Sequence, residues 1–331
     1  MAKVRVGIIG TGGMAQGHIR RLAQNPEAEI AALCDIKEAA LKRTVENHPT
    51  LKDVPQFYDF RDMIANVNLD AIHIDTPHTI HYEQIMYGLD KGLHVLTEKP
   101  MVCTVEHAHH VVNKVKETGK VLVLAYQRHY QPEFLYIRDE IASGKYGEVQ
   151  FVQGLQCQNW LQGCRGAWRH DPALSGGGQL NDSGSHLLGV LLFTTGLTVE
   201  SVAGFIDNFD VPVDINSALS LRFVGGAQGN ISVVGNSPTW HEDITIWCAK
   251  GVFFMRNGKL EVCGPDNKRF TPAAEEMPKG STPDDNLINA ILGREPVGSP
   301  ATWGLRVIEL TEAAWKSAAS HQITDVAHLK K

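Results

Sequence analysis

The sequence predicts an α/β protein with two domains: an N-terminal doubly wound parallel sheet and a C-terminal α/β domain with an open, mainly antiparallel sheet. Three observations support this prediction. The chain has 331 residues, and a single hydrophobic core usually stops growing beyond about 250–300 residues. Residues 1–125 alternate β-rich runs with amphipathic segments, whereas residues 199–262 carry several strand-like runs in succession.

We expect five strands and five helices in the first domain, residues 1–125. Each short β-rich run is followed by an amphipathic segment, which is typical of right-handed βαβ units. The expected strands are Val4–Ile9, Ile30–Cys34, Ala71–Ile74, Leu93–Leu96 and Val121–Ala125. The expected helices lie near Gly13–Gln24, Glu38–Asn47, Phe60–Ala65, His81–Lys91 and Val105–Thr118.

The second domain, expected over residues 126–331, begins with a helix near Pro132–Ser143, a strand at Val149–Cys157 and an apolar helix that ends near Thr195. Strand-like runs then follow one another with turn residues between them, which favours antiparallel pairing. These runs are Val202–Ile206, Ala218–Phe223, Gly229–Val234, Ile244–Cys248 and Gly251–Met255.

The C-terminal part of the chain is helical again. Thr282 supplies an N-cap, Pro283 suits the first helical position, and Gly293 supplies a stop signal. A last helix is expected over Trp303–Ala319 and could pack back on the first domain.

The composition is that of a packed protein. Hydrophobic residues make up 43% of the chain and charged residues 21%, which is too apolar for intrinsic disorder. The formal charge is -6 with no basic block, so we expect no nucleic-acid partner. The sequence shows no apolar run of roughly 20 residues and no signal-peptide pattern. We therefore expect a cytoplasmic protein without membrane association.

No metal site is expected from the cysteines and histidines. The six cysteines are scattered and include no CxxC pair, which indicates reduced thiols rather than a disulfide framework or a zinc site. His107, His109 and His110 form a local cluster, but no carboxylate or cysteine joins them in a metal-binding pattern. This cluster is more typical of a solvated helix face.

A glycine-rich loop follows the first expected strand and opens the first helix. Its sequence, Gly10-Thr11-Gly12-Gly13-Met14-Ala15, matches the G-x-G-x-x-G/A fingerprint. Gly10 permits a tight turn, Gly12 lets the backbone approach a pyrophosphate, and the small Ala15 permits close packing of the helix on the strand. In this setting the motif predicts a dinucleotide bound by a Rossmann domain.

Asp35 follows the second expected strand, where a carboxylate can accept both hydroxyls of the adenosine ribose. A 2′-phosphate would meet a like charge there, at roughly 4 kcal/mol for unit charges about 4 Å apart near a protein surface. NAD is therefore favoured over NADP, although Lys37 leaves some room for a phosphate. The alternative is that Asp35 caps the helix that follows.

Three residues are candidates for acid–base chemistry. Lys99 follows a strand at the expected carboxyl edge of the sheet, where open α/β folds bind ligands. Asp182 and His186 are four residues apart on an expected helix, so their Cβ atoms would lie about 5–6 Å apart on one face. A carboxylate beside an imidazole orients it and stabilises its protonated form. The alternative is an ordinary helix pair and a surface lysine.

The segments around these residues resemble a known family. Thr76-Pro77-His78, His81 and Gly92-Leu93-His94-Val95-Leu96-Thr97-Glu98-Lys99-Pro100 resemble the TPN…H…GKHVxxEKP signature of the Gfo/Idh/MocA family, named after glucose–fructose oxidoreductase and inositol dehydrogenase. Gly176-Gly177-Gly178-Gln179-Leu180-Asn181-Asp182-Ser183-Gly184-Ser185-His186 is similar to the family's GGGxxxDxGxH signature. With the nucleotide loop, three ordered motifs carry the resemblance.

The resemblance implies that Lys99, Asp182 and His186 form the catalytic group. Two positions depart from the family pattern: His78 stands where Asn is usual, and Gly189 stands where Asp often follows. The second departure weakens any transfer of substrate identity. The expected cofactor-binding residues are Gly10, Thr11, Gly12, Gly13, Met14, Ala15, Asp35, Thr76, Pro77, His78, His81, Glu98, Lys99 and Gln127.

Several polar and aromatic residues are candidates for substrate binding. Arg128 carries donors suited to sugar hydroxyls or a carboxylate, unless it forms a salt bridge in a surface loop. Trp160 and Trp168 offer faces that suit the apolar side of a pyranose, although tryptophans are as often core residues. The expected substrate-binding residues are Lys99, Arg128, Trp160, Trp168, Arg169, Asp182 and His186.

The predicted function is NAD-dependent hydride transfer at a secondary carbinol of a sugar, cyclitol or glycoside. One alternative is a glycosidase or lyase that recycles NAD through transient oxidation at C3, and another is a non-catalytic sugar-sensing regulator. The resemblance also implies a homodimer or homotetramer formed through the second domain's sheet.

Overall fold

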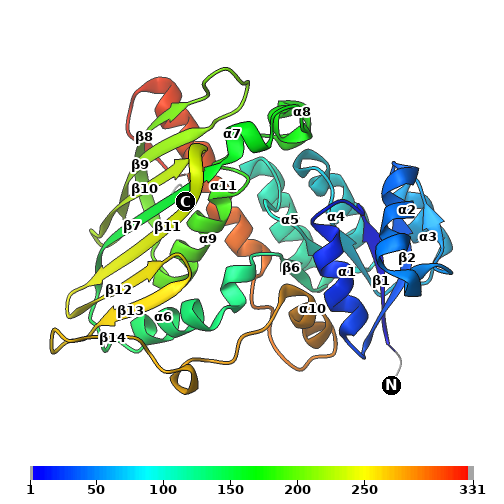
Figure 1. Cartoon of the computed structure of the whole chain (residues 1–331), viewed down its shortest axis with the longest axis horizontal. Helices are drawn as coiled ribbons and strands as arrows, with labels where there is room; N and C mark the ends of the chain where they lie inside the picture. Colours follow the sequence, from blue (N-terminus) through cyan, green and yellow to red (C-terminus); the bar gives the residue numbers. More distant parts are fainter. Residues whose placement is uncertain (1–2, 327–331) are drawn as a thin grey trace. The chain divides into compact units, whose positions relative to one another are not determined.

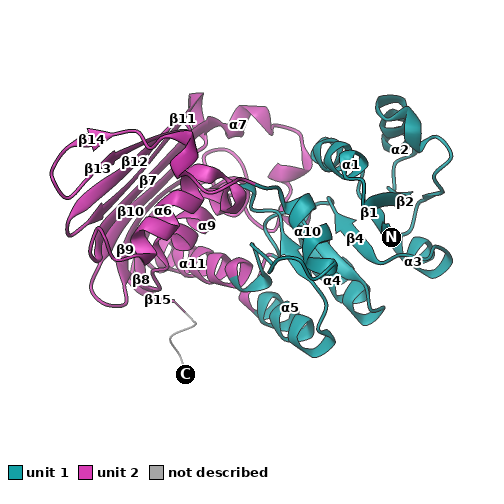
Figure 2. Cartoon of the chain, turned by 90° about the horizontal axis from the view of Figure 1, so that it is seen from below, with its two compact units in different colours: residues 1–102, 106–127, 281–302 teal, residues 103–105, 128–280, 303–331 magenta. Residues whose placement is uncertain are grey.

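The computed structural model describes residues 3–326 and contains two compact units (Figures 1 and 2). Unit 1 consists of the residues up to 102, residues 106–127 and residues 281–302. Unit 2 consists of residues 103–105, residues 128–280 and the residues from 303 onward. The first unit thus extends slightly past the expected end at residue 125, and a segment that was expected in the second domain belongs to it.

Unit 1 is built on a six-stranded sheet with the order β3-β2-β1-β4-β5-β6, in which all strand pairs are parallel. The strands β1 and β4 are buried along nearly their whole length, which is why they appear in the sequence as apolar runs. The strand order reverses between β1 and β4, the place where doubly wound sheets bind dinucleotides. The strands are β1 (Val4–Ile9), β2 (Ala28–Cys34), β3 (Gln56–Phe57), β4 (Ala71–Ile74), β5 (His94–Thr97) and β6 (Leu122–Leu124).

Helices cover both faces of this sheet (Figure 2). One of them, α10, comes from the C-terminal part of the chain and contacts α1, β5 and β6. Its predicted cap is confirmed, because Thr282 Oγ1 accepts a hydrogen bond from the Asp285 N–H at 3.1 Å. The helices are α1 (Ala15–Gln24), α2 (Glu38–Asn47), α3 (Phe60–Asn66), α4 (His81–Asp90), α5 (Val105–Thr118) and α10 (Pro283–Ile291).

Unit 2 contains a nine-stranded sheet with the order β14-β13-β12-β11-β7-β10-β9-β8-β15. The expected antiparallel character is confirmed for every pair except β7 with β10, which is parallel. Buried and exposed residues alternate along β9 and β10, so one face of the sheet meets the core and the other meets solvent. The strands are β7 (Val149–Asn159), β8 (Val199–Asp207), β9 (Asn216–Phe223), β10 (Gln228–Val234), β11 (Asn236–Cys248), β12 (Gly251–Arg256), β13 (Lys259–Cys263), β14 (Arg269–Phe270) and β15 (Thr324–Asp325).

Three helices cover one face of the second sheet (Figure 1). They are α6 (Pro132–Ala142), α9 (Gly184–Thr195) and α11 (Ala301–Ser320), and two short helices, α7 (Trp160–Gly163) and α8 (Pro172–Ser175), precede α9. Helix α9 is buried nearly all round, which explains why its sequence is apolar without an amphipathic stripe. Across residues 3–326, the helices are too short or too polar to cross a membrane.

Candidate active site

The glycine-rich loop between β1 and α1 leaves room for a pyrophosphate. Gly10 has a φ of +88°, and a Cβ there would lie 2.7 Å from the backbone oxygen of Asp75, so glycine is required. At Gly12 and Gly13 an added Cβ would meet nothing within 4 Å. This open space borders the start of α1, where backbone N–H groups favour an anion. The residues present therefore fit the phosphates of NAD.

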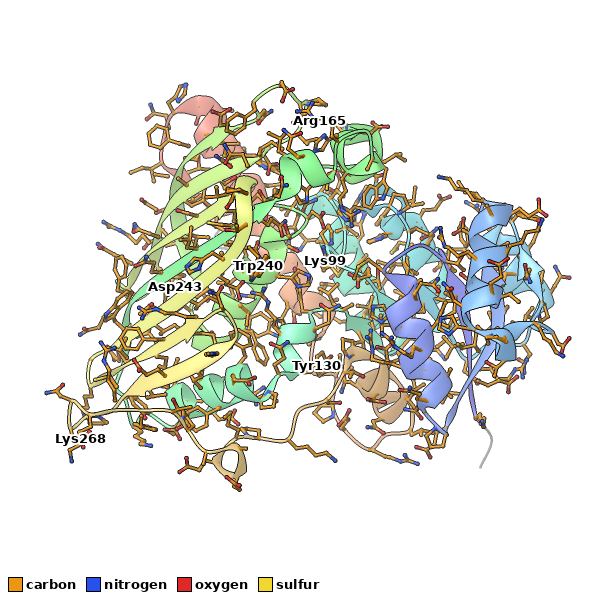
Figure 3. All side chains as sticks on the ribbon, viewed as in Figure 1. Lys99, Tyr130, Arg165, Trp240, Asp243 and Lys268 are labelled. Carbon is orange, nitrogen blue, oxygen red and sulfur yellow. The ribbon has the colours of Figure 1, made fainter. Side chains whose placement is uncertain are left out.

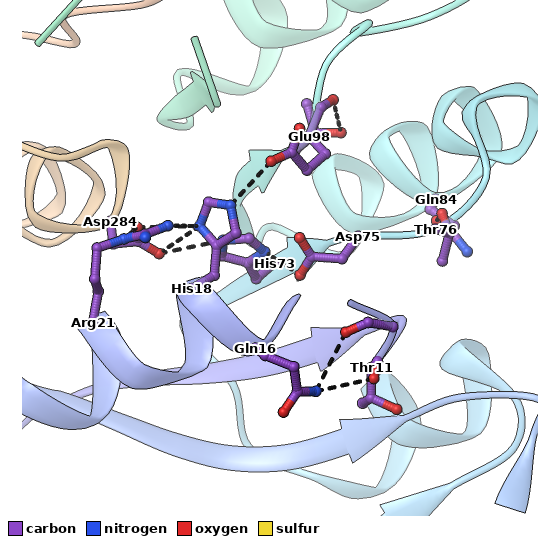
Figure 4. Close-up of polar contacts among 12 residues, drawn as sticks. Thr11, Gln16, His18, Arg21, His73, Asp75, Thr76, Gln84, Glu98 and Asp284 are labelled. Atoms are coloured by element: carbon purple, nitrogen blue, oxygen red, sulfur yellow. Dashed lines mark hydrogen bonds and ion pairs between the residues drawn. The ribbon is translucent and has the colours of Figure 1, made fainter. Parts of the chain in front are cut away.

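The first turn of α1 holds this loop in place. Gln16 Nε2 donates to the Thr11 carbonyl oxygen at 3.1 Å (Figure 4). It also donates to Thr44 Oγ1 at 2.9 Å and so joins the loop to α2. Ala15 is buried, as close helix–strand packing requires, whereas Met14 is exposed. Gln16 was not predicted, because the fingerprint leaves its position open and the contact with α2 is tertiary.

The Asp35 carboxylate ties the end of β2 to the glycine-rich loop. Its Oδ2 accepts from the Thr11 N–H at 2.8 Å and from Thr11 Oγ1 at 3.1 Å. Its Oδ1 accepts from the Lys37 N–H at 2.9 Å. Lys37 is the N-cap residue of α2, and this helix has no side-chain cap, so Asp35 is not the cap that the alternative described. A carboxylate offers about four acceptor positions, so these bonds leave capacity for ribose hydroxyls.

The segment Thr76–His78 follows β4 and is connected to the end of β5 by His81. The His81 Nδ1 atom lies 2.9 Å from the carbonyl oxygen of Pro100, and its Nε2 lies 2.9 Å from that of Thr76. Burial lowers the pKa of His81. The Thr76 hydroxyl also donates to Gln84 Oε1 at 2.7 Å. His81 therefore shapes the carboxyl edge of the sheet by joining two loops.

Glu98, Lys99 and Gln127 lie together after β5 and β6. The Lys99 N–H donates to Glu98 Oε2 at 3.0 Å, and Gln127 Nε2 donates to Glu98 Oε1 at 3.4 Å. Glu98 and Lys99 are 5% and 7% exposed. The structure thus places an almost fully buried lysine (labelled in Figure 3) at the carboxyl edge of the first sheet.

The prediction that Asp182 and His186 share a helix is wrong. Helix α9 begins at Gly184, so His186 lies in its first turn and Asp182 lies in the turn before it. The Gly184 N–H bonds to the Gln179 carbonyl oxygen at 2.8 Å, which closes this turn ahead of the helix. The face-sharing argument for residues four apart therefore does not apply.

Two side chains that are predicted to contact the substrate hold the Asp182 carboxylate. Trp160 Nε1 donates to Asp182 Oδ2 at 3.1 Å, and Arg169 Nε donates to the same oxygen at 2.7 Å. The Arg169 guanidinium also lies over the Trp168 ring, 4.5 Å from its centroid. Trp160 and Arg169 thus fix the orientation of a buried carboxylate that follows the triple-glycine loop.

Asp214, which was not predicted as a site residue, holds the triple-glycine loop through hydrogen bonds to two backbone N–H groups. Its Oδ1 accepts from the Gly178 N–H at 2.8 Å and from Trp315 Nε1 at 3.1 Å, and its Oδ2 accepts from the Leu180 N–H at 2.7 Å. Burial raises the pKa of Asp214, although the hydrogen bonds oppose this. A Cβ at Gly177 would lie 2.6 Å from the Trp315 ring. This clash explains why the motif has glycine at position 177.

Arg128 forms a salt bridge, as the alternative prediction stated, but not in a surface loop. Its Nη1 lies 2.6 Å from Oε1 of Glu242 on β11, and both side chains are largely buried. Within the histidine cluster, His107 stacks on Tyr82 at 3.8 Å between centroids, and His110 Nδ1 lies 3.0 Å from the Tyr82 hydroxyl. These contacts give the two histidines a packing role on α5.

Comparison with known proteins gives matches over most of the chain. Residues 4–126 match a family model described as "Oxidoreductase family, NAD-binding Rossmann fold", and residues 134–254 match the "GFO/IDH/MocA C-terminal domain". The D-glucoside 3-dehydrogenase of Escherichia coli (strain K12) is 27% identical over 203 residues, which are 60% of this chain and 56% of that protein. A glycosyl hydrolase family 109 protein of Shewanella baltica (strain OS155 / ATCC BAA-1091) is 29% identical over 159 residues, 45% of this chain and 34% of that protein.

A solved structure shares the fold. The WlbA dehydrogenase from Bordetella pertussis, in complex with NADH and UDP-GlcNAcA, matches with a TM-score of 0.85 at 24% identity. The match covers 99% of this chain and 98% of the WlbA chain. The chain spans little more than half of the glucoside dehydrogenase. Because models of one family match both halves of the chain, the protein belongs to the Gfo/Idh/MocA oxidoreductase family and carries its NAD-binding Rossmann domain.

Proposed function

We propose that this protein is an NAD-dependent oxidoreductase that transfers a hydride between a secondary carbinol of a sugar, cyclitol or glycoside and nicotinamide. The family and its NAD-binding domain support the reaction class. The relationship to a D-glucoside 3-dehydrogenase supports a sugar-like substrate.

The observation that carries the proposal is the position of Lys99. Pyrophosphate binding at the loop after β1, with the adenosine ribose toward Asp35 after β2, leaves the nicotinamide half to extend toward the ends of β4 and β5. Lys99 follows β5 and is almost fully buried. An ammonium in this position can donate to the carbinol oxygen and stabilise the alkoxide that develops as hydride leaves.

His186 is the acid–base group in this proposal. Bound NAD supplies the hydride acceptor. A ring nitrogen of His186 accepts the hydroxyl proton, the carbinol C–H leaves as hydride with its electron pair, and the C–O bond becomes a carbonyl. The Asp182 carboxylate, held by Trp160 and Arg169, is the third member of the proposed catalytic group, and its negative charge would favour the protonated imidazole.

The test is turnover of the purified protein with NAD and a panel of free sugars, inositols and glycosides. Nicotinamide reduction and glycoside cleavage are followed in the same samples. We expect reduction in proportion to oxidised product, without cleavage. Replacing His186 by Asn should lower kcat by about 10²–10⁴-fold and leave NADH affinity nearly unchanged. The matched control is His241→Asn, at an exposed position on β11; equal kcat values in the two variants would contradict the assignment.

A second candidate is a glycosidase or lyase that recycles NAD, which the similarity to a glycosyl hydrolase family 109 protein favours. Transient oxidation at C3 acidifies the neighbouring C–H, so that the substituent can be eliminated before the ketone is reduced again. Glycoside cleavage without net nicotinamide reduction in the same assay would establish this activity in place of the first.

We further propose that the second sheet pairs subunits into a homodimer or homotetramer. Phe205 on β8 is 79% exposed and Trp240 on β11 (labelled in Figure 3) is 51% exposed, so each of these strands carries a large apolar side chain that a second subunit would cover in this proposal. Light scattering coupled to size-exclusion chromatography measures the mass in solution. A monomeric mass across the accessible concentration range would contradict this proposal.

A further inference from the structure

A cluster of ionisable side chains is buried in unit 1, and only one of its members belongs to the expected cofactor site. His18 on α1, His73 on β4 and Asp284 on α10 have side chains that are at most 1% exposed. Asp75 and Glu98, which follow β4 and β5, are also buried, and Arg21 covers the outer end of the cluster. Figure 4 shows these residues joined in one network.

His18 lies between two carboxylates. Its Nδ1 is 2.9 Å from Asp284 Oδ1, and its Nε2 is 3.1 Å from Glu98 Oε1. Although burial lowers it, hydrogen bonds to Asp284 and Glu98 raise the pKa of His18 to about 10. Because a carboxylate only accepts hydrogen bonds, the charged ring, which carries a hydrogen on both nitrogens, donates from Nε2 to Glu98.

Basic side chains lie beside the carboxylates of the cluster. Arg21 Nε donates to Asp284 Oδ2 at 2.5 Å, and His73 Nδ1 lies 2.8 Å from Asp75 Oδ2. Although burial lowers the pKa of His73, the two neighbouring carboxylates, Asp75 and Asp284, raise it. Each of the three carboxylates thus lies beside at least one basic side chain, and pairing of this kind is the condition under which buried charges are tolerated.

Histidines and carboxylates this close together could also hold a metal ion. At the His18 end, however, Arg21 Nη2 lies 2.8 Å from Nδ1. A metal ligand needs the lone pair of that nitrogen, and a guanidinium beside it would repel the ion. This contact therefore argues against a metal ion at Nδ1 of His18, between His18 and Asp284.

Glu98 connects the buried cluster to the backbone of Lys99. One of its oxygens, Oε1, accepts from His18 and from Gln127, and the other, Oε2, accepts from the Lys99 N–H at 3.0 Å. Loss of the His18 contact at 3.1 Å would remove the shorter of these two hydrogen bonds to Oε1, since the Gln127 contact measures 3.4 Å. The Glu98 carboxylate would then be freer to rotate away from the Lys99 amide.

We propose that His18 is a positioning residue that acts through Glu98 to fix the backbone of Lys99. Asp284 and Arg21 hold His18 in turn, so that α10, which comes from the C-terminal part of the chain, helps to set the lysine's position. This inference rests on the proposed role of Lys99.

The experiment compares His18→Leu, which removes the donor to Glu98, with His18→Gln, whose amide nitrogen reaches about the position of Nε2. Both substitutions are made in the wild-type chain and together with Glu98→Gln. The control is Asp285→Asn, which alters the neighbouring acid on α10 that bonds Asn25 and Thr282. Measurements are kcat and KM, the thermal midpoint, and the Lys99 amide signal in protein labelled with 15N-lysine and assigned with Lys99→Arg.

We expect His18→Leu to lower kcat about tenfold, the effect of losing one hydrogen bond to a charged group, and to move the Lys99 amide signal. His18→Gln should keep most of the wild-type kcat and leave the Lys99 amide signal close to its wild-type position. In the Glu98→Gln background, His18→Leu should add little, because coupled residues give non-additive effects. Asp285→Asn should lower only the thermal midpoint.

Three results would overturn the proposal. The first is an unmoved Lys99 signal in His18→Leu beside a lowered midpoint, which would make His18 structural only. The second is an equal effect of His18→Leu in both backgrounds. The third is a stoichiometric metal ion found by elemental analysis of the purified protein. If no substrate turns over, the proposed function fails while the amide signal still decides the role of His18.

Discussion

Arg169 Nε donates to Asp182 Oδ2 at 2.7 Å, from a short helical turn that precedes the triple-glycine loop. Trp160 Nε1 reaches the same oxygen at 3.1 Å. Two residues that sequence reasoning assigned to the substrate therefore contact a candidate catalytic carboxylate, and the first prediction concerns this pair.

Replacing Arg169 by Met should lower kcat by about 10- to 100-fold, since a hydrogen bond to a charged group is worth about 1.5–3 kcal/mol and about 1.4 kcal/mol is a factor of ten. NADH affinity should change little. The control is Arg165→Met on the same segment, where the exposed side chain pairs with Asp210. Equal kcat values for the two variants would show that the Arg169 contact does not contribute to turnover.

Replacing Gly178 by Ala should destabilise the protein by about 3 kcal/mol, the upper end of overpacking costs. The new Cβ would lie 1.9 Å from the Asp214 carbonyl oxygen, and a backbone atom cannot move aside as a side chain can. Urea unfolding measures the change. Gly163→Ala is the matched control, since its Cβ would meet nothing within 4 Å and should change stability by less than about 0.5 kcal/mol. Similar unfolding midpoints would refute this account of the glycine.

Replacing Asp35 by Ser should reduce the preference for NAD over NADP by at least about tenfold, as the ratio of kcat/KM values. The change removes the negative charge that a 2′-phosphate would face, while the serine hydroxyl can still bond the Thr11 N–H. Asp62→Ser, at an exposed position on α3, controls for the loss of one negative charge. If Asp35→Ser keeps the wild-type preference, Asp35 does not determine the choice between NAD and NADP.

Glu309 on α11 should make stability depend on pH. Burial raises its pKa from 4.5 to about 7, although Arg306 opposes this. The folded state therefore binds the proton more tightly than the unfolded state. The stabilisation is complete below pH 4.5 and is lost as pH rises through about 7.

We expect the free energy of unfolding to fall between pH 5 and pH 8 in the wild type, and to fall less in Glu309→Gln, by up to about 3 kcal/mol. The measurement is urea unfolding at the two pH values. Glu200→Gln, at an exposed position on β8, should behave as the wild type. The same pH dependence in Glu309→Gln and wild type would rule out Glu309 as the titrating group.

Local patterns in the sequence were enough to predict the class of the fold and the nucleotide loop. The apolar runs Val4–Ile9 and Ala71–Ile74 became the centre of the parallel sheet, because strands buried on both faces must be apolar throughout. Gly10 adopts a positive φ against the Asp75 backbone, as a fixed turn between strand and helix requires. Short-range sterics and hydrophobic periodicity decide such features, so they can be read from neighbouring residues.

The tertiary structure decided which side chains meet. His18 and Glu98 are 80 residues apart in the chain, and His18 and Asp284 are 266 apart, so no local pattern indicates their network. Asp214 could not be predicted for the same reason, because only the folded chain brings its carboxylate within hydrogen-bonding distance of the Gly178 N–H. Arg169 and Trp160 were visible as polar and aromatic candidates, but their partner could not be predicted. Hydrogen bonds and ion pairs between distant segments depend on the register and packing of whole elements, which a single sequence does not display residue by residue.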